Sequence, residues 1–211
     1  MDCKGRHALS CMSGGDSVVV HNAVRDLLHD YCQRAQVRPQ LEAPGILPGR
    51  RRPADILVRG AAGLFPRLPD GSRPHGLAPL ALDVAVVNAL GESHWDETRR
   101  HSGAAASGYA ARKRVHNHTA AVCDQAGAVY LPLVWEAQGG CAKETRAFLH
   151  RLLGLAAVVE DCSPDTVRAR LHDQLAILLA RAGGRAVRRR RIGPPGGAVA
   201  KHAVGELLLE V

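Results

Sequence analysis

The feature that most constrains this chain is a pair of aspartates, each set among apolar residues that favour β-strands. The two segments are Pro53-Ala54-Asp55-Ile56-Leu57-Val58 and Leu80-Ala81-Leu82-Asp83-Val84-Ala85-Val86-Val87. A carboxylate buried between strands destabilises a fold by several kcal/mol unless a cation or a hydrogen-bond donor pairs with it. Two such acids, followed by Lys113 in the next helical stretch, indicate a metal-dependent site that cuts phosphodiester bonds.

The predicted order of elements favours an α/β fold. A helix is expected from Asp16 or Ser17 to about Val37, because an apolar stripe recurs at helical spacing through Val20, Val24, Leu27, Leu28, Tyr31 and Ala35. Strands are expected over residues 39–44, 54–59, 78–90 and 128–136. Helices are expected from His94 to Val122 with breaks near Gly103 and Gly108, from Ala142 to Val159 and from Pro164 to Ala182. Consecutive strands followed by a helical crossover imply a mixed sheet flanked by helices.

The same pattern divides the chain into a core and three peripheral segments. Residues 1–16 are expected to be a flexible N-terminus, and residues 17–160 form the core, which includes a Gly- and Pro-rich surface loop over residues 60–77. Residues 161–183 form a C-terminal helix, and residues 184–211 form a basic tail rich in Gly, Pro and Arg.

The charge balance favours a polyanionic partner. The 211 residues carry a formal charge of +8 and have a pI near 9.6. Aromatic residues make up only 3% of the chain, which argues against a stacking platform for single-stranded nucleic acid. The sequence shows no apolar run of bilayer-spanning length and no hydrophobic signal core, and its six cysteines are scattered. We therefore expect no membrane partner and an intracellular, reducing location, the nucleus in a eukaryote.

The candidate site suits a hard divalent cation. Mg²⁺ prefers carboxylate oxygens and keeps several waters, so Asp55 and Asp83 from neighbouring strands can supply the protein's share of ligands. Lys113 would stabilise the developing charge, and Tyr109, four residues earlier, shares its helix face. Two further acids sit near predicted strand ends and could complete a metal shell; they are Glu42 and Glu136.

Several of these residues have a purely structural alternative that the sequence leaves open. Asp55 could cap a turn, Asp83 could pair with an arginine, and Lys113 could be a solvated helix residue. A basic face of the first helix has two interpretations of its own, solvation or phosphate contact. Its residues are His21, Arg25 and His29.

The order of these motifs resembles the PD-(D/E)xK restriction-endonuclease-like superfamily. More narrowly, residues 5–155 resemble the C-terminal endonuclease domain of site-specific non-LTR retrotransposon proteins. The resemblance implies an α-β-β-β-α-β core with added C-terminal helices. It also implies a site for Mg²⁺ or Mn²⁺ at Asp55 and Asp83, with Lys113 catalytic and Glu42 as an auxiliary acid.

The resemblance extends to a zinc site and has clear departures. The family carries a Cys-Cys-His-Cys zinc knuckle before the nuclease, and His7 and Cys11 look like its last two ligands. The first motif here is Pro-Ala-Asp, with one residue more than Pro-Asp. The position two after Asp83 is Ala85, so the catalytic lysine has to be Lys113.

The function expected from these observations is metal-dependent cleavage of DNA. The alternative is a catalytically inactive nucleic-acid-binding remnant of a mobile element, and a third is an interaction protein whose Arg-rich tail binds RNA. The residues expected to hold the DNA backbone are Arg50, Arg51, Arg52, Tyr109 and Arg112.

Overall fold

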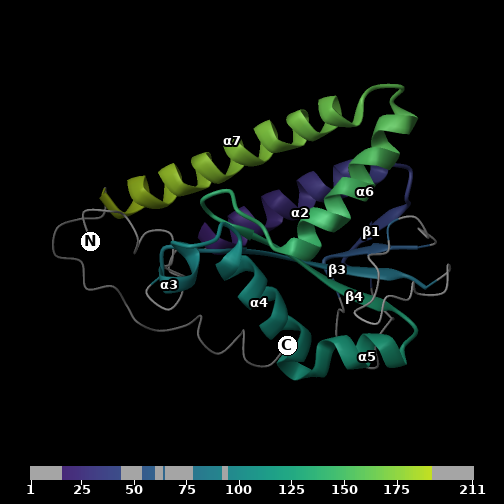
Figure 1. Ribbon diagram of the computed structural model, residues 1–211, viewed down its shortest axis with the longest axis horizontal. Coiled ribbons are helices and arrows are strands. Elements are labelled where there is room, and N and C mark those ends of the chain that lie inside the picture. Colours follow the sequence, from purple (N-terminus) through teal and green to yellow (C-terminus); the bar gives the residue numbers. More distant parts are fainter. Residues whose placement is uncertain (1–15, 44–53, 60–63, 65–77, 92–94, 192–211) are drawn as a thin grey trace.

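A four-stranded mixed sheet lies at the centre of the computed structural model, which describes residues 16–43, 54–59, 64, 78–91 and 95–191 (Figure 1). The strands are β1 (Pro39–Leu41), β2 (Ile56–Val58), β3 (Leu80–Val87) and β4 (Val129–Glu136), and they lie side by side in that order. β1, β2 and β3 pair antiparallel, whereas β3 and β4 are parallel. A parallel pair needs a long crossover, and the helices between β3 and β4 supply it. The predicted α/β class, with a mixed sheet flanked by helices, is confirmed.

Two helices, α2 (Asp16–Arg34) and α6 (Lys143–Val159), cover one face of the sheet. A third, α7 (Pro164–Arg191), packs across them as an outer layer, so that the three enclose the main core (Figure 1). Val24, Leu28 and Tyr31 of α2 are fully buried, as the predicted apolar stripe requires. Burying each such side chain contributes about 1.5–3 kcal/mol to the stability of the fold, so this stripe holds α2 against the sheet.

The opposite face of the sheet is covered by a helix built from small residues, α4 (Ala104–Val115). Ala106 and Ala110 of α4 pack against Ala85 of β3 and Val134 of β4. Because these contact residues are small, the helix axis can approach the sheet closely. The close approach carries Lys113, at the far end of α4, toward the middle strands.

The helical stretch predicted from His94 to Val122 is divided more finely than expected. It consists of α3 (Trp95–Thr98), α4, a 3₁₀ turn η4 (His116–His118) and α5 (Thr119–Gln125). The break expected near Gly103 is confirmed, since Gly103 has a left-handed backbone with φ of 85°. The break expected near Gly108 is wrong, because Gly108 lies inside α4.

The C-terminal helix is longer than predicted. α7 continues through Gly183 and Gly184 to Arg191, so neither its predicted end at Ala182 nor a tail starting at residue 184 is correct. A glycine inside a helix is unfavourable by about 1 kcal/mol relative to alanine. Burial beyond the glycines offsets this, because Ala186 is still buried. None of the helices in the described part of the chain has the length and apolar character needed to cross a membrane.

Candidate active site

Three acidic residues are aligned across three neighbouring strands. The β2–β3 register pairs Ile56 with Leu82, so one further step places Asp55 opposite Asp83. The β1–β2 register likewise places Glu42 opposite Asp55. Backbone hydrogen bonds continue the ladder to this level, since Glu42 N–H donates to Asp55 O (2.9 Å) and Asp55 N–H donates to Leu82 O (3.0 Å). The strand pairing therefore brings together acids that are far apart in sequence.

Two residues that are distant in the sequence contact the Asp83 carboxylate, one from α4 and one from β4. Lys113 Nζ lies 2.8 Å from Oδ1 and 2.7 Å from Oδ2 of Asp83. The Tyr130 hydroxyl, from β4, donates a hydrogen bond to Oδ2 of the same carboxylate. Burial, together with the negative charge of Asp83, raises the pKa of the Tyr130 hydroxyl well above its usual value, so this group stays protonated and donates. The structural alternative suggested by the sequence paired Asp83 with an arginine. The structure instead pairs it with a lysine and a tyrosine.

Asp55 is held by the first helix and by the neighbouring strand. His21 Nε2 lies 3.2 Å from Asp55 Oδ1, and the Val84 N–H donates to Oδ2 at 2.7 Å. Burial acts to raise the pKa of this carboxyl, but the hydrogen bond and charge of His21 oppose it. With added contributions from the Val84 N–H and the charge of Lys113, the net effect lowers the pKa below its usual value. Asp55 is therefore an ionised acid adjacent to Asp83.

Glu42 belongs to the row of acids by backbone position, but its carboxylate has a different partner. Arg25 Nη1 of α2 lies 3.1 Å from Glu42 Oε1. The Glu42 side chain is 45% exposed, whereas the Arg25 side chain is only 14% exposed. Arg25 and His21 thus contact acids at the end of the β1–β2 pair, so of the two interpretations of the basic face, solvation is wrong for these two residues.

Glu136 has a structural role, so its assignment as a candidate metal ligand is not supported. Its side chain is only 3% exposed. The carboxylate accepts hydrogen bonds from the backbone N–H groups of Gly103 (3.1 Å) and Ala106 (3.4 Å). These donors belong to the start of α4, where backbone N–H groups lack helical partners and the helix dipole favours a negative charge. Glu136 therefore fixes the position of α4 on the sheet.

A basic surface adjoins Asp83 at the C-terminal end of α4. Arg112 and Lys113 both lie over the ring of Tyr109, at 5.5 and 5.9 Å from its centroid. The next turn carries His116 and His118, both exposed. Two of the residues predicted to contact DNA, Tyr109 and Arg112, are thus beside the catalytic candidate Lys113. The others, Arg50, Arg51 and Arg52, and the zinc candidates His7 and Cys11 lie outside the described residues.

No family profile, curated protein or solved structure matches this chain. The chemistry of the site therefore has to be inferred from its own residues. His21 and Tyr130 are site residues that the sequence motifs do not identify as catalytic candidates. The i, i+4 spacing of His21 and Arg25 on α2 is a local signal for the first of them. Tyr130 has no local signal, because its contact with Asp83 depends on the parallel pairing of β3 with β4.

The donor set suits a hard divalent cation with several waters of its own. Within the part of the chain that the structure describes, no three His, Cys, Asp or Glu side chains cluster closely enough to enclose a metal. Mg²⁺ does not require such an enclosure, since one or two carboxylates plus waters and substrate phosphate can hold it. Asp55 and Asp83 offer two carboxylates that are 22% and 19% exposed. Their partial burial restricts their orientation, and the exposed fraction leaves both carboxylates accessible to a metal ion from solvent.

Proposed function

We propose that this chain is a divalent-metal-dependent DNA endonuclease with a restriction-endonuclease-like core, related to the target-nicking domains of retrotransposons. The observation that carries the proposal is the convergence of Asp55, Asp83 and Lys113 beside the middle of β3, where the β1–β2 pair ends. Asp83 lies in β3, Lys113 lies in α4, and Asp55 directly precedes β2. Two carboxylates and the Lys113 ammonium group therefore lie together at a partly exposed site.

Each residue has a role that follows from its surroundings. Asp55 and Asp83 would bind Mg²⁺ or Mn²⁺ through their carboxylates, while His21 and Tyr130 orient those carboxylates. A bound cation of this kind polarises a phosphoryl oxygen and lowers the pKa of its water. Lys113 supplies a positive charge that can stabilise the phosphorane-like charge developing at the scissile phosphate.

The surroundings of the site favour a nucleic-acid substrate. Tyr109 and Arg112 flank Lys113 on α4, and the exposed His116 and His118 extend the polar surface around the helix end. Contacts of this kind reach phosphates without reading bases, so they provide affinity with little sequence preference. Binding should consequently weaken steeply as salt concentration rises.

One observation favours the second candidate, an inactive nucleic-acid-binding remnant of the same kind. Both oxygens of Asp83 are within hydrogen-bonding distance of Lys113, and the Tyr130 hydroxyl donates to one of them. A metal bound at Asp83 has to share this carboxylate with a resident cation. If the sharing is too unfavourable, the fold would keep its DNA contacts and lose cleavage.

The experiment that separates the two candidates is nicking of supercoiled plasmid in Mg²⁺ or Mn²⁺, with DNA binding measured in parallel. The variants are Asp55→Asn, Asp83→Asn and Lys113→Met. The matched control is Asp165→Asn, which removes an exposed carboxylate that pairs with Arg168 on α7. A nuclease predicts metal-dependent nicking by the wild type and the control, with at least about a hundredfold loss in each site variant.

The outcomes differ for each candidate. Salt-sensitive DNA binding without nicking by the wild type would favour the inactive remnant and overturn the nuclease. Nicking that persists unchanged in all three site variants would place the active site elsewhere and overturn the assignment. Loss of nicking in the control as well would point to misfolding, which circular dichroism of each variant tests directly.

A further inference from the structure

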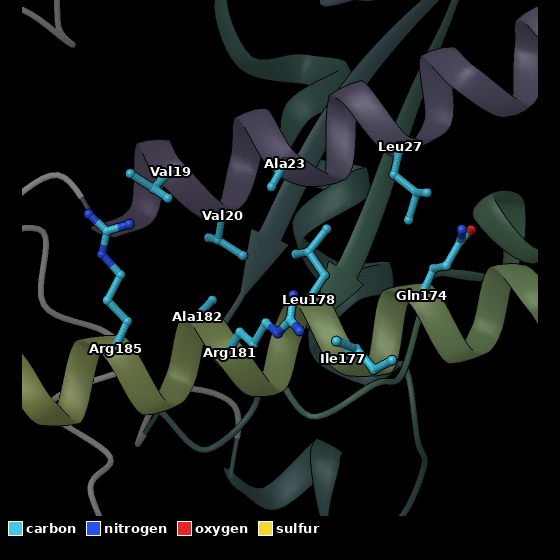
Figure 2. A pocket seen from close by; sticks show the side chains of 10 residues that line it. All are labelled: Val19, Val20, Ala23, Leu27, Gln174, Ile177, Leu178, Arg181, Ala182 and Arg185. Atoms are coloured by element: carbon cyan, nitrogen blue, oxygen red, sulfur yellow. The ribbon is translucent and has the colours of Figure 1, made fainter.

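A concave surface lies between α2 and α7, separate from the acidic site. Figure 2 shows side chains from both helices facing into it, and its volume is about 500 Å³. The apolar lining comes from Val19, Val20, Ala23 and Leu27 of α2 and from Ile177 and Leu178 of α7. This groove, which we call the α2/α7 groove, takes no part in the chemistry proposed above.

The apolar lining of the groove is unusually accessible for a packed helix pair. Val19 is 41% exposed and Ile177 is 52% exposed. The adjacent Val18, on the same turn of α2, is 57% exposed. Apolar side chains gathered in one exposed groove leave water when a partner covers them, so this groove is suited to docking an apolar surface.

The charged lining of the groove has one sign. Arg181 and Arg185 of α7 line it, and they are one helical turn apart, so they form a basic edge beside the apolar floor (Figure 2). Asp16 is the acid near this edge, and its carboxylate lies 3.9 Å from Arg185 Nε. The remaining polar lining residue is Gln174, whose side-chain oxygen accepts a hydrogen bond from Tyr31 at 2.9 Å.

We propose that the α2/α7 groove docks an amphipathic helix of a partner protein, with acidic residues along one edge of its apolar face. The walls of the groove are two helices, so no strand edge is available to add a β-strand. A third helix can lay its apolar ridge into such a groove through residues at i, i+3, i+4 and i+7. Acidic residues beside that ridge would meet Arg181 and Arg185.

Other occupants fit the groove less well. A nucleic acid would match the arginines but would leave Val19 and Ile177 facing a charged backbone. A second copy of this chain, joined across a two-fold axis, would place arginines of both copies at one interface, which repel. A small polar ligand would find few orienting groups, because Gln174 is already engaged by Tyr31.

The test uses the full chain and a labelled helical peptide with leucines at i, i+3, i+4 and i+7 and glutamates along one edge. Fluorescence anisotropy measures its affinity, and a peptide with lysines in place of the glutamates is the charge control. Ile177→Glu should weaken binding at least about tenfold, whereas Val158→Glu, on the 80% exposed Val158 of α6, should not. The double variant Arg181→Glu/Arg185→Glu should reverse the preference and favour the lysine peptide.

Methyl NMR of the wild type tests the same proposal without any substitution that could unfold the protein. Addition of the glutamate peptide should shift the methyl signals of Val19 and Ile177 and leave that of Val158 in place. Absence of binding, equal affinity for both peptides, or shifts outside the groove would overturn the proposal. So would a dimer in sedimentation that Ile177→Glu dissociates, because the occupant would then be a second copy. Asp83→Asn should bind the peptide normally, so the docking surface can be judged separately from the nuclease activity.

Discussion

Lys113 contacts both carboxylate oxygens of Asp83, at 2.8 and 2.7 Å, from a position 30 residues later in the chain. The contact requires α4 to lie close to the sheet, which its small residues Ala106 and Ala110 permit. It also requires α4 to start at a defined level, which the buried Glu136 sets by binding its first N–H groups. The Lys113–Asp83 pair therefore depends on the packing of α4 against the sheet and on the hydrogen bonds at its N-terminus.

Removal of the lysine should destabilise the protein and increase its dependence on metal. Lys113→Met leaves a partly buried carboxylate without its cation, and the expected loss is about 1–3 kcal/mol in the free energy of unfolding. Mg²⁺ should restore more stability to this variant than to the wild type, since it would replace the lost charge. Denaturant unfolding with and without Mg²⁺ measures both effects. Lys143→Met, at an exposed position on α6, is the control, and an equal response of both variants would contradict the prediction.

Tyr130→Phe, compared with Tyr31→Phe, should distinguish an effect on the orientation of Asp83 from a general loss of stability. Loss of the hydroxyl removes the hydrogen bond to Asp83 and should destabilise the fold by about 1–2 kcal/mol. Tyr31→Phe removes a comparable hydrogen bond, to Gln174, far from the acids. If the chain is a nuclease, nicking should fall about tenfold or more in Tyr130→Phe and stay near wild type in Tyr31→Phe. Equal nicking by both variants would show that the Tyr130 contact is structural only.

Gly103→Ala should be strongly destabilising. Gly103 has φ of 85°, and a side chain there would collide with the carbonyl oxygen of Cys141. The expected loss is about 2–4 kcal/mol, from backbone strain and from displacement of the loop that positions Glu136. Gly154→Ala is the matched control, because Gly154 lies inside α6 with open space around it, and it should stabilise by about 0.5–1 kcal/mol. Thermal unfolding of the two variants should therefore move in opposite directions.

An ion-pair cluster between three helices should make stability depend on pH. Arg34 Nε lies 2.6 Å and Arg170 Nη1 lies 3.0 Å from the carboxylate oxygens of Glu160. The hydrogen bond from Arg34 is the main cause that lowers the pKa of Glu160 below its ordinary value of 4.5. The contribution of ionised Glu160 to the free energy of unfolding is therefore complete at pH values above the ordinary pKa. It is lost as the pH falls through the lower pKa of the folded state.

The consequence can be measured with Glu160→Gln. At pH 7 this variant should be less stable than the wild type by about 1 kcal/mol or less, because the cluster is partly exposed. The difference should shrink toward zero once the pH is below the folded-state pKa. Asp173→Asn, at an exposed position on α7, should show no such pH-dependent difference. A difference for Glu160→Gln that is the same at low and neutral pH would contradict the assignment.

The strands and the acids within them were predictable because their signals are local. Asp83 stands out within an apolar, β-branched run, and the short β2 follows Asp55 directly. The end of α7 was not predictable from the same kind of signal. Gly183 and Gly184 indicate a helix stop, but buried contacts beyond them, as at Ala186, keep the helix going. The local preference against helix, about 1 kcal/mol for each glycine, is outweighed by the tertiary packing of α7.

By itself the sequence determined where charged residues stand within apolar runs, because such a residue is visible without any structure. It also determined the order of helices and strands, since hydrophobic periodicity is a property of neighbouring residues. Only the tertiary structure decided the partners: Lys113 and Tyr130 for Asp83, His21 for Asp55, and the N-terminus of α4 for Glu136. The physical reason is that these contacts depend on strand register and helix seating, which many distant residues set together.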